Sequence, residues 1–234
     1  SIVFVVATPF LVCYFQIKAV WDVLQWCLGL DGRTAYEPSQ RPDQELAVVI
    51  TGCDTGFGKE LAIVAAQEGY TVFACCLQES SFGQFDFLKS QVQPIQVDVT
   101  QDKDITAAAA TVKAWIEKAP AGKTRVLHAL CNNAGLGAGG YVDWTDIATY
   151  QRLMDVNFLG IIRCCKGFLP LFKAQAANGT YRNGARIFNI ASMAGIVKTA
   201  PGISAYGASK HAAVSVSSSL RQELAVFGIQ VCTV

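Results

Sequence analysis

The sequence predicts an α/β fold in which a doubly wound parallel sheet is preceded by a hydrophobic N-terminal segment. Short apolar runs alternate with segments of helical periodicity over residues 46–234, and this alternation is typical of parallel strands joined by right-handed helical crossovers. The first apolar run ends in a glycine-rich turn that opens a helix, as in the Rossmann arrangement. No charged side chain occurs before residue 18.

The individual elements follow from local patterns. Residues 46–50 form the first apolar run, and the helix expected over 57–68 has its apolar residues at helical spacing and Gly69 as its stop. The helix over 149–172 is expected to continue through Gly160 and Gly167. The other strands are expected over 71–74, 94–97, 126–131, 186–191 and 229–234, and the other helices over 106–118 and 204–227.

Composition limits the class of protein. The chain has 234 residues, of which 52% are hydrophobic and 16% charged, so it suits one domain with a sizeable core. The formal net charge is +1 and no block of like charges occurs, which argues against a nucleic-acid partner. The 9 cysteines include no C-x-x-C pair, so we expect neither a metal site nor a disulfide framework. Most of these thiols are expected to be reduced core residues.

The N-terminal segment is expected to lie at a membrane. Residues 1–30 are predicted to be a hydrophobic anchor, because their uncharged run of 17 residues is at the lower limit for a bilayer span. A surface-packing helix and the apolar part of a signal peptide are the alternatives. Residues 31–45 are predicted to be a linker, followed by one domain over 46–234. Because the chain starts at Ser1 and stops within a strand pattern, we expect it to be a C-terminally truncated part of a longer protein.

The turn after the first strand has the sequence TGCDTGFG over residues 51–58. Gly52 permits a tight turn, Gly56 lets a pyrophosphate approach the backbone, and Gly58 allows close packing of helix on sheet. The free N–H groups at the helix N-terminus then bind the pyrophosphate. A phosphate-binding P-loop is the alternative, but Glu60 replaces the serine or threonine that would hold magnesium there.

Two further polar groups follow strands. Residues 132–135, with the sequence NNAG, come directly after the fourth strand, at the sheet edge where doubly wound folds bind ligands. Ser192 follows the fifth strand, and Tyr206 and Lys210 lie four residues apart on one face of the last helix. A nearby ammonium lowers the pKa of a phenol, and a tyrosine tuned in this way can take a proton from an alcohol.

Together these motifs resemble the short-chain dehydrogenase/reductase family. The resemblance covers about residues 46–234, and the motifs at 51–58, 132–135, 192 and 206–210 have the order and spacing of that family. More narrowly, the sequence resembles the branch that contains retinol dehydrogenases, 17β-hydroxysteroid dehydrogenases and 3-hydroxybutyrate dehydrogenase. The segments that carry this narrower resemblance are 49–58, 72–77 and 167–171.

The resemblance implies a role for each matching residue. Tyr206 would be the acid/base, Lys210 would bind the nicotinamide ribose and lower the pKa of Tyr206, and Ser192 would hydrogen-bond the reacting oxygen. Asn157 would support a water-mediated proton path, although its own pattern indicates only a polar residue inside a helix. The same two α-helical residues, Tyr206 and Lys210, would bind the dinucleotide together with Gly52, Thr55, Gly56, Phe57, Gly58, Asp98, Val99, Asn133, Ala134 and Gly135. Among these, Asp98 and Val99 would contact the adenine, whereas Asp98 by itself suggests the cap of a strand end.

The choice between NAD(H) and NADP(H) depends on the end of the second strand. An acidic residue there would bind the ribose 2′-OH of NAD, and a nearby arginine would accept the 2′-phosphate of NADP. Cys76 and Leu77 stand at this place, and neither side chain decides. We expect NAD(H), from the branch and because no basic residue occurs between Leu77 and Lys89, while NADP(H) stays open.

These expectations describe an oxidoreductase that transfers a hydride between a nicotinamide cofactor and an alcohol or ketone, with an apolar substrate such as a retinoid or steroid. A 3-hydroxy acid dehydrogenase and a non-catalytic, membrane-associated dinucleotide-binding protein are the alternatives. The second would have no need of Ser192, Tyr206 and Lys210 together. The expected location is the endoplasmic reticulum membrane, with the mitochondrion as the alternative, and a homo-oligomer stays open. The Pro-Gly segment and substrate region that the family has after its sixth strand do not occur in these 234 residues.

Overall fold

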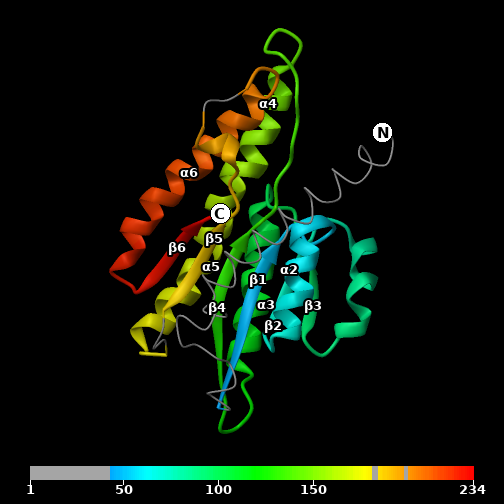
Figure 1. Ribbon diagram of the computed structural model, residues 1–234. Helices are drawn as coiled ribbons and strands as arrows, with labels where there is room; N and C mark the ends of the chain where they lie inside the picture. The colour runs from blue at the N-terminus through cyan, green and yellow to red at the C-terminus, as the bar shows by residue number, and fades with distance from the viewer. Residues whose placement is uncertain (1–42, 181–183, 198–199) are drawn as a thin grey trace, which may run out of the picture.

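The computed structural model describes residues 43–180, 184–197 and 200–234. Their centre is a six-stranded parallel sheet in the order β3-β2-β1-β4-β5-β6 (Figure 1). The strands are Gln44–Thr51 (β1), Thr71–Cys76 (β2), Val92–Gln96 (β3), Thr124–Asn132 (β4), Ala185–Asn189 (β5) and Ile229–Thr233 (β6). The predicted doubly wound α/β fold is therefore confirmed.

Helices cover both faces of the sheet. The helix α2 (Gly56–Gln67) and the 3₁₀ segment η2 (Glu79–Leu88) pack on one face, where they meet Leu46, Val48 and Ile50 of β1. The helices α3 (Asp102–Glu117), α5 (Gly160–Ala177) and α6 (Ser204–Ala225) pack on the other face, against Ala47 and Val49. Successive side chains of a strand point to opposite faces, so the continuous apolar run of β1 is the consequence of burial on both sides.

The topology defines where a ligand can bind. From β1 the strand order runs outward through β2 and β3, and from β4 it runs outward through β5 and β6. The order therefore reverses between β1 and β4, and in sheets of this kind ligands bind beyond the carboxyl ends of the strands at that point. The glycine-rich turn after β1 and the loop after β4 both lie there.

Two stretches differ from the sequence prediction. The single helix expected over 149–172 is a composite of α4 (Ile147–Met154), the π-helical turn η3 (Asp155–Leu159) and α5. The apolar spacing is continuous across the joins, so it gives no sign of the wide turn. Residues 79–88, for which the sequence pattern predicts no element, form η2, which buries Phe85. A single buried side chain gives no periodic signal.

β4 contains a bulge at His128. The register of β1 against β4 shifts by one residue between Ala47 and Val48, so that His128 is the extra residue of the longer strand. Gln175 of α5 satisfies the backbone at this point, because its Oε1 accepts a hydrogen bond of 2.8 Å from the Leu127 N–H. This buried position agrees with the prediction that His128 is structural.

The predicted anchor, residues 1–30, lies outside the described residues, as does most of the linker predicted over 31–45. The first described strand begins at Gln44, two residues before the expected Leu46. In the part of the chain that the structure describes, no helix is both long enough and apolar enough to cross a membrane.

Candidate active site

The glycine-rich turn between β1 and α2 forms a cradle with walls of backbone. Gly52 and Gly56 have φ of +70° and +60°, a left-handed conformation that glycine adopts without strain. A Cβ on Gly58 would lie 2.2 Å from the Gly52 carbonyl oxygen and 2.5 Å from Asn133 Nδ2. The sequence prediction for Gly58 needs one correction, because its close contact is with the turn and the neighbouring loop rather than with the sheet.

The loop after β4 is fastened to this turn. Asn133 Nδ2 donates to the Thr51 carbonyl oxygen at 2.8 Å and to the Gly52 carbonyl oxygen at 3.1 Å. The Thr51 hydroxyl accepts hydrogen bonds from the backbone N–H groups of Asn133 and Ala134, both at 3.0 Å. The two predicted motifs at 51–58 and 132–135 therefore form one unit at the carboxyl ends of β1 and β4.

A cavity of about 910 Å³ opens beside this unit. The Thr55 side chain does not cap α2 within the described residues, which leaves N–H groups of the first helical turn for an anion. Gly56, Gly58, Tyr206 and Lys210 are not in the lining, although Lys210 Nζ would lie 3.5 Å from a Cβ on Gly135, which is. The predicted dinucleotide-binding residues in the lining are Gly52, Thr55, Phe57, Asp98, Val99, Asn133, Ala134 and Gly135.

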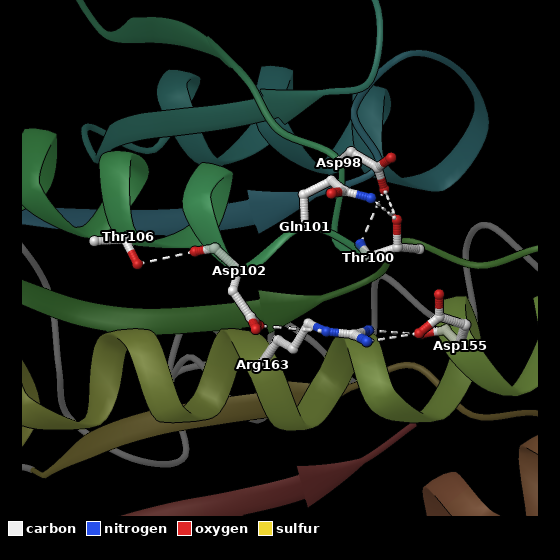
Figure 2. A network of polar contacts seen from close by, with 7 residues as sticks. All are labelled: Asp98, Thr100, Gln101, Asp102, Thr106, Asp155 and Arg163. Atoms are coloured by element: carbon white, nitrogen blue, oxygen red, sulfur yellow. Dashed lines mark hydrogen bonds and ion pairs between the residues drawn. The ribbon is translucent and has the colours of Figure 1, made fainter.

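Asp98 and Val99 lie just beyond the end of β3, at the side of the cavity. Asp98 Oδ1 accepts hydrogen bonds from the Thr100 N–H at 2.9 Å and the Thr100 hydroxyl at 2.8 Å (Figure 2). Val99 packs toward α5, since its Cγ2 would lie 3.0 Å from a Cβ on Gly160. Asp98 is therefore both a cap of the turn, as its own pattern suggested, and a residue of the cavity wall.

Asp54 has a place in the site that the sequence reasoning missed. Its Oδ2 accepts a hydrogen bond of 2.8 Å from the Leu77 N–H, and its Oδ1 accepts from the Gln78 N–H at 3.0 Å and the Ser81 hydroxyl at 2.9 Å. The glycine-rich turn thus supplies a carboxylate to the end of β2, where Cys76 and Leu77 offer none. Only the three-dimensional pairing of β1 with β2 reveals this proximity, because the residues are 23 positions apart.

Asn157 joins the loop after β4 to the last helix. Its side chain is buried in the π turn, where Oδ1 accepts from the Leu136 N–H at 2.7 Å and Nδ2 donates to the Leu136 carbonyl oxygen at 2.9 Å. Nδ2 also donates to Ser209 Oγ at 3.0 Å, and Ser209 donates to the Tyr206 carbonyl oxygen at 2.7 Å. Ser209 is a second residue that sequence reasoning missed, although it lies inside the Tyr206–Lys210 motif.

Tyr206 and Lys210 project from the same face of α6. Lys210 Nζ lies 5.7 Å from the centroid of the Tyr206 ring and donates to the Ile190 carbonyl oxygen at 2.9 Å. Burial lowers the pKa of Lys210 to about 8, because desolvation disfavours the ammonium. The Lys210 side chain thus lies beside the Tyr206 phenol, as the i, i+4 spacing predicts, and next to Gly135 of the cavity lining.

Ser192 comes to this cluster through the tight packing of η4 (Met193–Gly195) on α6. A Cβ on Gly195 would lie 2.6 Å from the Lys210 carbonyl oxygen, so only a glycine allows this approach. Ser192 Oγ caps η4 by accepting a hydrogen bond of 3.1 Å from the Ala194 N–H. Ser192, just before η4, and Asn157 in η3 therefore come from segments that pack against α6, which carries Tyr206 and Lys210.

The cysteines that the structure describes belong to the core. Cys53, Cys75, Cys76, Cys131, Cys164 and Cys165 are buried, and Cys232 is half-buried. Burial raises the pKa of Cys75, Cys76, Cys131 and Cys165 to about 12, which suppresses the reactive thiolate. Over the described ranges, no group of three or more His, Cys, Asp or Glu side chains could hold a metal ion.

Comparison with known proteins agrees with this geometry. The model of the family described as short chain dehydrogenase matches residues 46–234. The chain belongs to the short-chain dehydrogenase family. The predicted resemblance is thereby confirmed, and the motifs at 51–58, 132–135 and 206–210 are those of a family member.

Curated relatives fall in the predicted branch. The chain is 34% identical to mitochondrial D-beta-hydroxybutyrate dehydrogenase of Bos taurus over 208 residues, which are 87% of this chain and 57% of the relative. It is 35% identical to 17-beta-hydroxysteroid dehydrogenase type 6 of Bos taurus and 33% identical to retinol dehydrogenase 7 of Mus musculus, with 82% of this chain and 56% of each relative covered. The chain thus spans just over half the length of these relatives.

Solved structures share the fold. A short-chain dehydrogenase/reductase from Burkholderia phymatum in complex with NAD has a TM-score of 0.70 and 28% identity, over 82% of this chain and 64% of the other. A short-chain dehydrogenase from Burkholderia cenocepacia in complex with NADP has a TM-score of 0.67 and 26% identity, over 82% and 71%. These likenesses confirm the Rossmann-type sheet.

Proposed function

We propose that this short-chain dehydrogenase transfers a hydride between a nicotinamide dinucleotide and an alcohol or ketone. The observation that carries the proposal is that Gly135 joins two features: it lines the backbone-walled cavity at the N-terminus of α2, and a Cβ on it would lie 3.3 Å from Asn157 Oδ1 and 3.5 Å from Lys210 Nζ, in the cluster that also contains Tyr206. The binding of NAD or NADP by the two Burkholderia proteins supports a dinucleotide in the corresponding cavity. A binding protein without catalysis would not need the polar cluster.

Four residues of the chain have separate roles in the proposed proton transfer. A bound dinucleotide supplies the acceptor or donor of the hydride. Tyr206 takes the hydroxyl proton of the alcohol, and the Lys210 ammonium favours the phenolate that receives it. Ser192 Oγ holds the reacting oxygen by a hydrogen bond. Asn157, fixed between Leu136 and Ser209, supports the water path by which the proton leaves.

Replacement of Tyr206 by phenylalanine tests the proposal in the full-length protein. Tyr206→Phe keeps the ring and removes the transferable proton, so turnover should fall by roughly 10²–10⁴-fold while binding of NADH, followed by fluorescence, survives. Tyr150→Phe is the matched control, because it removes a hydroxyl that bonds Ser204 Oγ on α6 and should leave turnover within a few-fold of the unaltered protein. Near-normal turnover of Tyr206→Phe would favour the binding-protein alternative.

An apolar substrate suits the surroundings of Ser192. Met193, Ile196 and Val197 follow it and are exposed, the first two by 68% each, so an apolar alcohol would bury them. The names of two relatives, a 17-beta-hydroxysteroid dehydrogenase and a retinol dehydrogenase, support a steroid or retinoid, whereas the hydroxybutyrate relative supports a short hydroxy acid. Parallel assays of full-length protein with retinol, a 17β-hydroxysteroid and 3-hydroxybutyrate decide between them, and we expect turnover of an apolar alcohol to exceed that of the acid.

NAD(H) is the proposed cofactor, and Asp54 is the residue that supports the choice. Its carboxylate lies at the end of β2, where an acid can bind the ribose 2′-OH and repel a 2′-phosphate. Asp54→Asn should therefore shift the ratio of kcat/KM for NAD over NADP toward NADP by at least about tenfold, because a like charge at close range costs several kcal/mol. An unchanged ratio, or a strong preference of the unaltered protein for NADPH, would contradict the assignment.

We also propose that the protein associates with a membrane through residues 1–30. The uncharged run at their start supports this, and a relative named as mitochondrial agrees with an organelle location. Full-length protein should pellet with membranes in the absence of detergent, and a variant without residues 1–30 should stay in the supernatant. A full-length protein that stays soluble after lysis would exclude the anchor.

A further inference from the structure

Arg163, near the start of α5, contacts the first residue of the π turn in two ways. Its Nη2 lies 2.7 Å from Asp155 Oδ1, and its Nη1 donates to the Asp155 carbonyl oxygen at 3.3 Å (Figure 2). On its other side, Nε lies 3.4 Å from Asp102 Oδ1 at the start of α3. The Arg163 side chain is 22% exposed and that of Asp102 88% exposed, so the pair with Asp102 contributes little. The contact that matters is the one that holds both the side chain and the backbone of Asp155.

The place of Asp155 makes this contact important for the site. In the π turn the Gly160 N–H bonds the Asp155 carbonyl oxygen, five residues back, and such wide turns are rare and often lie at functional sites. Asn157 is two residues further on, and its amide bonds Leu136 and Ser209 outside its own helix. The shape of the turn therefore decides where the Asn157 amide lies.

We infer that Arg163 is a positioning residue that fixes the π turn through Asp155 and thereby holds the Asn157 amide against Leu136 and Ser209. Asp155 lines the cavity, and Arg163 contacts Asp155 and Asp102, so Arg163 acts on the site through Asp155. The structural part of the inference stands on these contacts alone. Its consequence for turnover rests on the proposed function.

Amide hydrogen exchange of Leu136 measures the structural part directly. The Leu136 N–H donates to Asn157 Oδ1 at 2.7 Å, so Arg163→Met should speed its exchange at least about fivefold, as expected for the loss of one hydrogen bond. Asn157→Ala should speed it by as much or more, and Arg163→Lys should restore part of the protection. Asp102→Asn, which removes only the exposed pair, is the matched control and should exchange like the unaltered protein. Unchanged Leu136 exchange in Arg163→Met overturns the inference.

A double-mutant cycle on turnover measures the catalytic part in full-length protein. Arg163→Met should lower kcat roughly tenfold or more through displacement of Asn157, with a smaller change in the KM for the dinucleotide. In the Asn157→Ala background the same change should have almost no further effect, because residues that act through one another are not additive. Full additivity would show a general structural role and overturn the inference. If the unaltered protein turns over no alcohol, the proposed function fails, and the exchange of Leu136 still decides the role of Arg163.

Discussion

Gly56 and Gly58 lie two residues apart in one turn but meet different constraints. Gly56 has φ of +60°, and a Cβ there would meet no atom within 4 Å, whereas a Cβ on Gly58 would lie 2.2 Å from the Gly52 carbonyl oxygen. At Gly56 a glycine is needed for the left-handed backbone conformation, and the free space beside it lets a ligand approach. At Gly58 a glycine is needed because other atoms of the protein already fill the space of a side chain. Spacing alone predicts all the glycines of the turn but does not distinguish these two reasons for them.

This difference predicts opposite behaviour of two alanine variants. Gly58→Ala should lower the free energy of unfolding by about 1–3 kcal/mol, the cost of overpacking, because carbonyl and amide groups must move to admit the methyl group. Gly56→Ala should cost only about 1 kcal/mol of backbone strain yet weaken the binding of NADH. Thermal unfolding and a fluorescence titration measure the two quantities separately. A Gly58→Ala variant as stable as the unaltered protein would contradict the packing argument for Gly58.

Lys210 makes folding stability depend on pH in the alkaline range. Its pKa is lowered from 10.5 to about 8 by burial, so between these values the unfolded chain binds the proton and the folded chain does not. Stability from this group is therefore complete above about pH 10.5 and is lost as the pH falls toward 8. The unfolding free energy of the unaltered protein, relative to Lys210→Met, should rise by on the order of 2 kcal/mol from pH 7 to pH 10. Denaturant titrations at the two pH values measure this difference, and a constant difference would show that Lys210 is not desolvated.

Sequence patterns predict residues that carry a motif and miss residues that act through space. Tyr206, Lys210 and Asn133 could be predicted because their neighbours in the chain identify them. Asp54 also lies inside a motif, but its carboxylate acts on Leu77 and Gln78, which only strand pairing brings near. Its role could be found only in the folded chain.

At the scale of elements, the loop after β4 depends on a few side-chain hydrogen bonds to the turn after β1. Asn133 Nδ2 donates to two backbone carbonyl oxygens, of Thr51 and Gly52. The pairing of β1 with β4 runs to Ile50 and Cys131, and just beyond it the Asn133 amide and the Thr51 hydroxyl continue to hold the two loops at a fixed separation. The width of the cradle follows from that separation.

The effect of a substitution at Asn133 should therefore depend on whether the new side chain can donate hydrogen bonds, and not on its volume. Asn133→Ala should lower the free energy of unfolding by about 1–2 kcal/mol, because both carbonyl oxygens lose a partner. Asn133→Asp has the same shape but cannot donate when ionised, and it should be at least as destabilising and should weaken dinucleotide binding. Chemical unfolding and NADH titration provide the test. Stability of Asn133→Asp equal to that of the unaltered protein would mean that the side chain serves only to fill space.

Helices and strands could be predicted where buried residues recur at regular spacing. They could not be predicted where a few contacts between distant residues accompany the local structure. The strands β1, β2, β4 and β5 follow from apolar runs because they are buried along most of their length, whereas the edge strands β3 and β6 are only partly buried. The π turn η3 could not be predicted in this way, because the bonds at it join residues apart in the chain: Asn157 donates to the Leu136 carbonyl oxygen, and Arg163 of α5 donates to the Asp155 carbonyl oxygen. Local propensity carries no information about such contacts.

At the scale of the whole molecule, the sheet contains an irregularity that charged and polar groups stabilise. The bulge at His128 places its ring against Tyr70, with 5.8 Å between centroids, and its Nε2 lies 3.2 Å from Arg186 Nη1. Tyr70, His128 and Arg186 are all buried and come from three different parts of the chain. The sequence shows His128 only as a polar residue in a strand pattern. Neither the bulge nor the contacts of His128 with Tyr70 and Arg186 change the periodicity of the sequence.

This cluster predicts how the fold responds to acid. Burial, and secondarily the Arg186 charge, lower the pKa of His128 from 6.5 to about 3, so the folded chain stays unprotonated there while the unfolded chain takes up a proton. Stability from this group is present above about pH 6.5 and is lost as the pH falls toward 3. By pH 4.5 the loss should be on the order of 2 kcal/mol.

His128→Gln isolates this effect from the titration of carboxylates, which is common to both proteins. The variant should be less stable at pH 7, because it loses the ring contact with Tyr70, but its deficit should shrink as the pH falls from 6.5 to 4.5, because it has no proton to take up on unfolding. Urea titrations at several pH values measure the difference, and His211→Gln, with an exposed ring on α6, provides the comparison for loss of a surface histidine. A deficit that stays constant or grows with acid would mean that His128 is protonated within the folded sheet beside Arg186.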